Sequence, residues 1–211
     1  MKTLDLDKMV VLAQCAENIN KSNDELLVVY DDDGISQGTA SRYICHKLGL
    51  LHKVVYLIIE NEKGELLVQT RGDTKKGRLD VPVGGHLNIN DNDEIQALIR
   101  EAKEEIAIEI TSKMLSFIFT YKRKNFGTLE KPHEKNYEIR KVFYLKISKD
   151  SSLDVFKNFE NREEIEMVRR LDWVSIEEVL IAIENNRCAD GLKESISHFL
   201  NWKLTTLPNN V

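Results

Sequence analysis

Residues 84–108 read GGHLNINDNDEIQALIREAKEEIAI, and this stretch joins a glycine pair, a polar loop and a run with helical periodicity. Apolar residues recur at intervals of three and four between Ile95 and Ile106, which predicts a helix with one apolar face. Asp91 precedes Glu94 by three residues, a spacing that resembles a capping box at a helix N-terminus. The stretch therefore predicts a tight turn that leads through a short loop into an amphipathic helix.

Three glutamates lie on this predicted helix: Glu101, Glu104 and Glu105. Because residues three and four apart share a helix face, their side chains would form one carboxylate cluster, and Arg100 can pair with Glu104. One interpretation is a solvated face with ordinary ion pairs. The other is a site for Mg²⁺, a hard ion that prefers oxygen ligands and commonly bridges phosphate oxygens. The glycine pair ahead of the helix favours the second interpretation, since glycine lets a backbone approach a ligand or a helix closely.

The composition is that of a soluble globular protein, with 42% hydrophobic and 31% charged residues among 211. A net charge of -5 argues against non-specific binding to nucleic acid. No uninterrupted apolar run approaches the roughly 18 residues that a membrane helix needs, so we expect no membrane partner. Three widely spaced cysteines argue against a disulfide framework and favour the reducing cytoplasm.

Strand and helix signals are interleaved along the rest of the chain. Strands are expected at residues 25–30, 52–61, 64–71, 80–83, 114–122, 139–147 and 165–174, and helices at 5–20, from 175 onward and at 191–202. Residues 41–47 are expected to form a short helix or a loop. This pattern predicts an α+β fold with a mixed β-sheet sandwiched between helices and with extra N- and C-terminal helices. We divide the chain into an N-terminal helical extension (1–24), one domain (25–185) and a C-terminal helix and tail (186–211).

Residues 85–108 resemble the Nudix box, which runs from a glycine through a spaced acid to Arg-Glu-apolar-x-Glu-Glu-x-Gly-apolar. The matching positions are Arg100, Glu101, Ala102, Glu104, Glu105 and Ile108. The resemblance implies the Nudix fold for the domain at 25–185. It also implies metal-dependent hydrolysis of a diphosphate linkage, as in a nucleoside diphosphate joined to another group. By the same resemblance the three glutamates bind Mg²⁺ or Mn²⁺, and Arg100 orients one glutamate. We also expect Glu104 or Glu105 to take part in catalysis, by accepting the proton of an attacking water directly or through its role as a metal ligand.

Two positions depart from this pattern. The spaced acid is Asp91, whose side chain is shorter and which lies one residue too far from Arg100. The glycine expected after the acids is Ala107, and alanine does not favour a left-handed helix cap. These departures affect the loop and the helix end, and they leave the three glutamates in place.

A wider resemblance, over roughly residues 25–180, is to the branch of Nudix proteins that includes isopentenyl-diphosphate isomerases. It rests on the segment ELLVVYDDDGISQGTASRYICHKLGLLHKVVYLIIENEKGELLVQTR and on DVPVGGH. This resemblance implies a second metal site, formed by His46, His52, His86 and Glu138, where Mn²⁺ or Zn²⁺ could bind. A histidine at any one of these positions is also compatible with a purely structural role.

The choice between a hydrolase and an isomerase depends on Gly84. In the isomerases of this branch a catalytic cysteine lies just before the Gly-His of the box turn, where this chain has Gly84. Protonating and deprotonating a carbon skeleton needs a positioned acid and base, and glycine supplies neither. We therefore expect a pyrophosphate-bond hydrolase, with an isomerase-like enzyme as the alternative.

Substrate-binding residues are expected around the loop ahead of the box. Arg71 and Arg78 flank a glycine-bounded loop and could hold phosphate by charge and hydrogen bonds, beside Gly84 and Gly85. A basic surface loop without a ligand is the competing interpretation. The expected partner is a small-molecule diphosphate, and the N-terminal extension is a candidate contact for a homodimer.

Overall fold

A computed structural model of the chain describes residues 24–71, 77–126, 135–147 and 168–206. The chain divides into two compact units, each built from several segments. The first unit comprises residues 1–54, 86–94 and 121–140, and the second comprises residues 55–85, 95–120 and 141–211. The helix expected at residues 5–20 lies outside the described residues, and the domain boundaries at 24 and 185 stay predictions.

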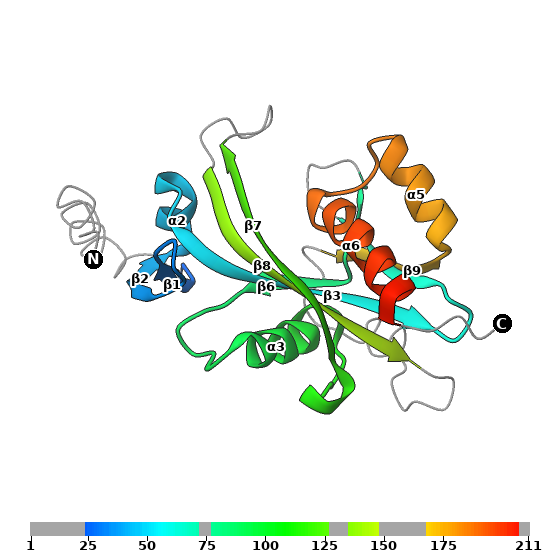
Figure 1. Ribbon diagram of the computed structural model, residues 1–211, viewed down its shortest axis with the longest axis horizontal. Helices are drawn as coiled ribbons and strands as arrows, with labels where there is room; N and C mark the ends of the chain where they lie inside the picture. Colours follow the sequence, from blue (N-terminus) through cyan, green and yellow to red (C-terminus); the bar gives the residue numbers. More distant parts are fainter. Residues whose placement is uncertain (1–23, 72–76, 127–134, 148–167, 207–211) are drawn as a thin grey trace. The chain divides into compact units, whose positions relative to one another are not determined.

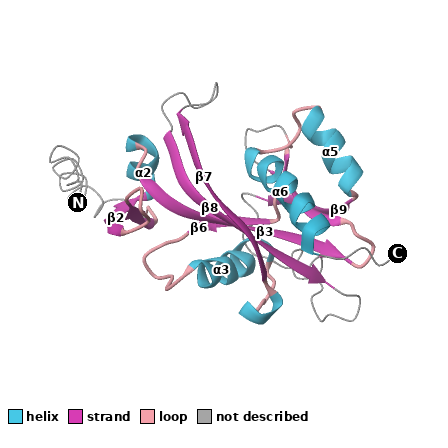
Figure 2. Cartoon of the chain, in the orientation of Figure 1, coloured by secondary structure: helices cyan, strands magenta, loops and turns pink. Residues whose placement is uncertain are grey.

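Strands and helices are interleaved along the described residues, as Figure 1 and Figure 2 show. They are β1 (Leu26–Tyr30), β2 (Ser36–Ser41), α2 (Arg42–Leu48), β3 (Leu51–Asn61), β4 (Leu66–Arg71), β5 (Leu79–Asp80), β6 (Val83–His86), α3 (Glu94–Ile106), η1 (Ser112–Met114), β7 (Ser116–Phe126), β8 (Lys135–Ile147), β9 (Val168–Val174), α5 (Ile176–Glu184) and α6 (Asp190–Thr206). Together with the described helices, the nine strands confirm the predicted α+β fold with a mixed sheet. Strands β3, β6, β7 and β8 each contribute residues to both units. Among the described helices, none is long and apolar enough to cross a membrane.

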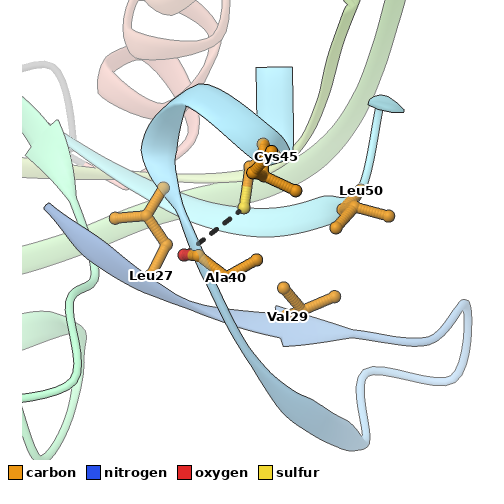
Figure 3. Packing of buried hydrophobic residues seen from close by; sticks show 6 residues of the cluster. Leu27, Val29, Ala40, Cys45 and Leu50 are labelled. Carbon is orange, nitrogen blue, oxygen red and sulfur yellow. Dashed lines mark hydrogen bonds between the residues drawn. The ribbon is translucent and has the colours of Figure 1, made fainter. Parts of the chain in front are cut away.

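In the first unit, β1 pairs antiparallel with β2 and with the start of β3. Leu27 and Val29 alternate with less buried neighbours along β1, which is the period-two pattern of a half-buried strand. Figure 3 shows the buried apolar cluster that they join, whose members are Leu27, Val29, Ala40, Ile44, Cys45 and Leu50. Helix α2 supplies two of these residues and ends at Gly49 in the left-handed conformation. The helix alternative for residues 41–47 is therefore confirmed.

In the second unit, β4 pairs antiparallel with β3, β5 and β9. The hairpin between β3 and β4 turns at Asn61, whose side-chain oxygen accepts hydrogen bonds from the backbone of Lys63 and Glu65. After β9, Ser175 and Glu178 form a capping box that starts α5, as the sequence predicts for a helix from residue 175. These turns and caps are local, and they are the features that the sequence analysis locates best.

A buried polar contact ties α6 to β3 within the second unit. Glu60 is 2% exposed and accepts hydrogen bonds from the Tyr144 hydroxyl at 2.6 Å and from the Lys203 ammonium of α6. The Tyr144 ring also stacks on Phe199, a fully buried residue of α6. The helix predicted at residues 191–202 is thus confirmed, and it continues to Thr206.

Two local predictions are wrong. The strand predicted at residues 80–83 is replaced by β5 and β6, which are separated at Pro82, a residue with no backbone N–H to donate. Strand β5 pairs with β4, whereas β6 pairs with β3. The predicted capping box is also wrong, because α3 begins at Glu94 and Asp91 lies too early to be its N-cap. Instead, Asp91 Oδ2 accepts a hydrogen bond from the backbone of Asn88, at 3.0 Å, within the preceding loop.

Candidate functional sites

The first candidate site lies in the second unit, on α3. Arg100 Nη1 donates to Glu101 Oε1 at 2.9 Å and to Glu104 Oε2 at 3.0 Å, so one nitrogen bridges two carboxylates. Glu101 is 9% exposed, Glu105 is half-buried and Glu104 is exposed. A buried carboxylate is costly unless it is paired, and the Arg100 guanidinium supplies that pairing. The solvated-face interpretation is therefore wrong for Glu101.

The glycine pair of β6 backs two of these carboxylates. The backbone N–H of Gly84 donates to Glu105 Oε2 at 2.8 Å. A Cβ atom added at Gly85 would lie 1.9 Å from Glu101 Cδ, so a larger residue there would displace the Glu101 side chain. Glycine at position 85 is thus what lets Glu101 lie against the strand. Both glycines are evident in the sequence, but only the structure shows that Gly84 lies against Glu105 and Gly85 against Glu101.

The second candidate site lies in the first unit, where His46 of α2, His52 of β3 and His86 of β6 come together. Their ring centroids are 5.0, 5.4 and 5.3 Å apart in the three pairs. One possible ligand atom from each histidine lies within 4.8 Å of the other two. His52 and His86 are buried, and His46 is half-buried. These residues, called the histidine triad below, are therefore close enough to share one metal ion.

Hydrogen bonds orient two rings of the histidine triad. His52 Nδ1 donates to the Leu50 carbonyl at 2.8 Å, and His46 Nδ1 lies 2.6 Å from Asn136 Oδ1, to which it can donate. Burial lowers the pKa of His52 to about 4, so its imidazole is neutral at pH 7. Among the described residues, neither His46 Nε2 nor His52 Nε2 has a hydrogen-bond partner, although both atoms are buried. Metal-binding histidines have this arrangement, with one nitrogen held by an acceptor and the other presenting its lone pair.

Glu138 and Arg140 of β8 lie beside the histidine triad, and each is 4% exposed. Glu138 Oε1 is 3.9 Å from His52 Nε2, while Glu138 Oε2 accepts a hydrogen bond from Arg140 Nε at 2.6 Å. The role of Glu138 as a metal ligand stays a prediction. Arg140 was not predicted, because the strand was expected to begin at residue 139. Since β8 begins at Lys135, the spacing of two places the side chains of Glu138 and Arg140 on one face.

Glu25 is a second carboxylate beside the triad that the sequence analysis missed. Its Oε2 atom is 3.8 Å from His86 Nδ1 and 4.0 Å from Arg42 Nη1. Its other oxygen accepts a hydrogen bond from the Asn88 side chain at 3.4 Å. No spacing in the sequence could have linked Glu25 to His86, because strand pairing and the loop after β6 bring them together.

Comparison with known proteins decides the family. The family model described as the NUDIX domain matches residues 50–194. The chain belongs to the Nudix family. The chain is also 42% identical over 57 residues to isopentenyl-diphosphate delta-isomerase IDI1 of Gibberella zeae. That match covers 25% of this Nudix chain and 22% of the isomerase, so the chain spans less than a quarter of that relative.

Solved structures resemble this Nudix chain over most of its length. DR0079 from Deinococcus radiodurans matches with a TM-score of 0.59 and 20% identity, covering 82% of this chain and 97% of that one. A NUDIX hydrolase from Nitrosomonas europaea matches with a TM-score of 0.51 and 18% identity, covering 71% of this chain and 88% of that one. At these identities the similarity concerns the fold alone, and it agrees with the predicted Nudix fold.

In the Nudix box of this chain, helix α3 is followed by Ala107, which adopts the left-handed conformation with φ of 56°. The Ala107 N–H donates to the Lys103 carbonyl and the Ile108 N–H donates to the Ala102 carbonyl, both at 3.2 Å. Alanine therefore takes the cap geometry that glycine would adopt without strain, at a cost of about 1 kcal/mol. Alanine in place of glycine at position 107 therefore lowers the stability of this helix end without changing its geometry.

The carboxylates of the Nudix box fit a hard divalent ion. Glu101, Glu104 and Glu105 offer oxygen ligands from one helix, and strand β6 donates a hydrogen bond to Glu105 and leaves room for Glu101. The predicted substrate-binding arginines are less well placed by the structure. Arg78 is half-buried just before β5, and the side chain of Arg71 lies outside the described part of the chain. Phosphate binding by these two residues stays a prediction.

Proposed function

We propose that this Nudix protein hydrolyses a diphosphate linkage in a substrate of the nucleoside diphosphate-X type or a related compound, with Mg²⁺ or Mn²⁺ as its metal. The observation that carries the proposal is the position of Glu101, buried against Gly85 and bridged through Arg100 to Glu104. A carboxylate cluster held this rigidly suits a hard ion that also contacts phosphate oxygens.

The residues of the cluster have distinct tasks in this proposal. Glu105 accepts a hydrogen bond from Gly84, and Glu101 packs against Gly85 and accepts one from Arg100, so both act as fixed ligands. Glu104 is exposed and can reach either the metal or a water molecule, from which it can accept a proton. Arg100 keeps the carboxylates of Glu101 and Glu104 at a set separation. When bound, the ion would supply positive charge to the phosphate oxygens and lower the pKa of a water molecule.

The surroundings of Gly84 support hydrolysis over isomerisation. A Cβ atom added at Gly84 would lie 2.7 Å from Cδ1 of Tyr56, so the tyrosine ring fills the space that a larger residue there would need. The described cysteines cannot replace a missing acid or nucleophile at this turn. Burial raises the pKa of Cys45 to about 12 and that of Cys188 to about 11, so both thiols stay protonated and unreactive.

A second candidate function is an isomerase-like reaction of a diphosphate, with a metal at the histidine triad and Glu138. The convergence of the three histidines supports this candidate, as does the local similarity to the isomerase. Neutral imidazole nitrogens with a carboxylate suit Mn²⁺ or Zn²⁺. We place this function second, because Gly84 supplies no acid or base while the helix carboxylates are complete.

A product assay tests both functions. The purified protein would be incubated with Mg²⁺ or Mn²⁺ and with nucleotide sugars, dinucleotides, nucleoside triphosphates or isopentenyl diphosphate. Released phosphate or monophosphate and the allylic isomer would both be followed. We expect bond cleavage that is lost in Glu104→Gln. Isomer formation without cleavage would overturn the hydrolase and support the second function.

We also propose that the protein acts in the cytoplasm on a small molecule and without a nucleic-acid partner. Its net charge of -5 and the free thiols of the two described cysteines, Cys45 and Cys188, support this proposal. The contact proposed for a homodimer, at residues 1–24, lies almost wholly outside the described residues. Light scattering of the full chain over a range of concentrations would test the dimer.

A further inference from the structure

Each carboxylate beside the histidine triad has an arginine partner. Glu138 Oε2 accepts a hydrogen bond from Arg140 Nε at 2.6 Å, and both side chains are buried. Glu25 lies 4.0 Å from Arg42, a weaker pair because the Arg42 side chain is 47% exposed. The two acids and the two arginines therefore sum to no net charge, and an imidazole that binds a cation through its lone pair adds no negative charge.

This balance matters when a divalent cation enters the triad. A buried charge is costly unless an opposite charge accompanies it. If Glu138 were unpaired, its carboxylate could offer both oxygens and a full negative charge to the cation. With Arg140 in contact, Glu138 Oε2 is occupied and the carboxylate charge is already matched. The positive charge that a cation adds to the triad is then available to an anion from outside the chain.

We propose that Arg140 withholds one oxygen and the charge of Glu138 from a cation on the histidine triad, so that the loaded triad binds a phosphate group. This inference rests on the metal site of the second candidate function. It makes Arg140 a positioning residue that acts through Glu138. A closed structural site would instead take all its ligands from the protein, and a catalytic or ligand-binding site keeps one position open.

Calorimetry on the full chain tests the inference. The background would be Glu104→Gln/Glu105→Gln, so that the helix carboxylates contribute little to metal or phosphate binding. Co²⁺ would be titrated first, and its visible absorption, recorded in parallel, would report nitrogen ligands. Inorganic phosphate would then be titrated into the Co²⁺-loaded protein. Compared with this background, we expect Arg140→Gln to bind Co²⁺ about tenfold more tightly and phosphate about tenfold more weakly. Affinities within twofold of the background for both ligands would overturn the inference.

A paired variant separates charge matching from direct contact. Glu138→Gln/Arg140→Gln removes both charges, so we expect its loaded triad to keep phosphate affinity within about threefold of the background. Loss of phosphate binding in this variant would mean that Arg140 contacts phosphate itself, and the inference would be wrong. The paired variant also serves if Arg140→Gln, which leaves a buried acid unpaired, does not fold.

A third variant distinguishes a wrong metal site from a wrong role for Arg140. His86→Ala in the same background removes one triad nitrogen and should abolish the Co²⁺ absorption. If Co²⁺ binds this variant as it binds the background, the metal is not on the triad, and both the second function and the inference fail. If Co²⁺ binding requires His86 but does not respond to Arg140, only the inference fails.

Discussion

The two candidate sites of this protein match charge in opposite ways. On α3, three carboxylates share a helix with one guanidinium, that of Arg100, which pairs with two of them, so these four residues carry excess negative charge. At the histidine triad, the neighbouring acids are paired with arginines and the ligands are neutral nitrogens. In the functions proposed above, the first site would attract a cation by charge and the second by lone pairs. The first set of ligands would then favour a hard ion and the second a borderline ion.

The largest expected effect tests the carboxylate site. Glu104→Gln should lower metal-dependent hydrolysis about 1,000-fold, because it removes a charge that the metal and the water both need. Steady-state rates with Mg²⁺ over a range of concentrations would measure the loss. Glu109→Gln is the matched control, since this glutamate is 83% exposed at its side chain and pairs with Lys103. Equal rates in the wild type and Glu104→Gln would remove the helix carboxylates from the mechanism.

The next effect tests the histidine triad. His86→Ala in the otherwise wild-type chain should weaken the binding of Zn²⁺ about 100-fold, because one of three ligand nitrogens is lost. Competition with a chromophoric chelator would measure the affinity. His198→Ala is the control, because His198 is exposed on α6 and stacks on Phe119. Unchanged Zn²⁺ affinity in His86→Ala would mean that the histidine triad does not hold the ion, and the contrast between a carboxylate site and a histidine site would be wrong.

A smaller effect tests the support behind the carboxylates. Gly85→Ala should destabilise the protein by about 1–3 kcal/mol and also lower its activity, because the new methyl group must displace Glu101. Urea unfolding and rate measurements on the same samples would separate the two effects. Gly191→Ala is the control, since its nearest contact is a milder 3.1 Å, to Asp80 Oδ1. Wild-type stability in Gly85→Ala would show that Glu101 does not lie where the structure places it.

The smallest expected effect concerns the end of the carboxylate helix. Ala107→Gly should stabilise the protein by about 1 kcal/mol, because glycine adopts a φ of 56° without strain. Thermal unfolding would detect the gain. Asn186→Gly is a useful comparison at φ of 53°, and its gain should be smaller because asparagine tolerates this conformation better than alanine does. A loss of stability in Ala107→Gly would contradict the left-handed cap.

Local elements were predictable where a short-range rule applies. Residues three and four apart share a helix face, so α3 and its glutamates could be located from spacing. The turn at Asn61 and the cap at Ser175 follow from side chains that bond their own neighbours. Pro82 could have indicated the split between β5 and β6, because it has no backbone N–H to donate, but no local rule shows that the two strands pair with different partners.

The sequence by itself determined the carboxylate helix, the glycine pair before it and the family to which the chain belongs. All three depend on residues that lie within about one helix and one turn of each other in the sequence. The tertiary structure decided which glycine supports which glutamate, that Glu101 is buried, and that three histidines from three elements meet. It also decided that Arg140 occupies one oxygen of Glu138. These facts depend on distances between segments far apart in the chain, which strand pairing and packing set and which no spacing of residues encodes.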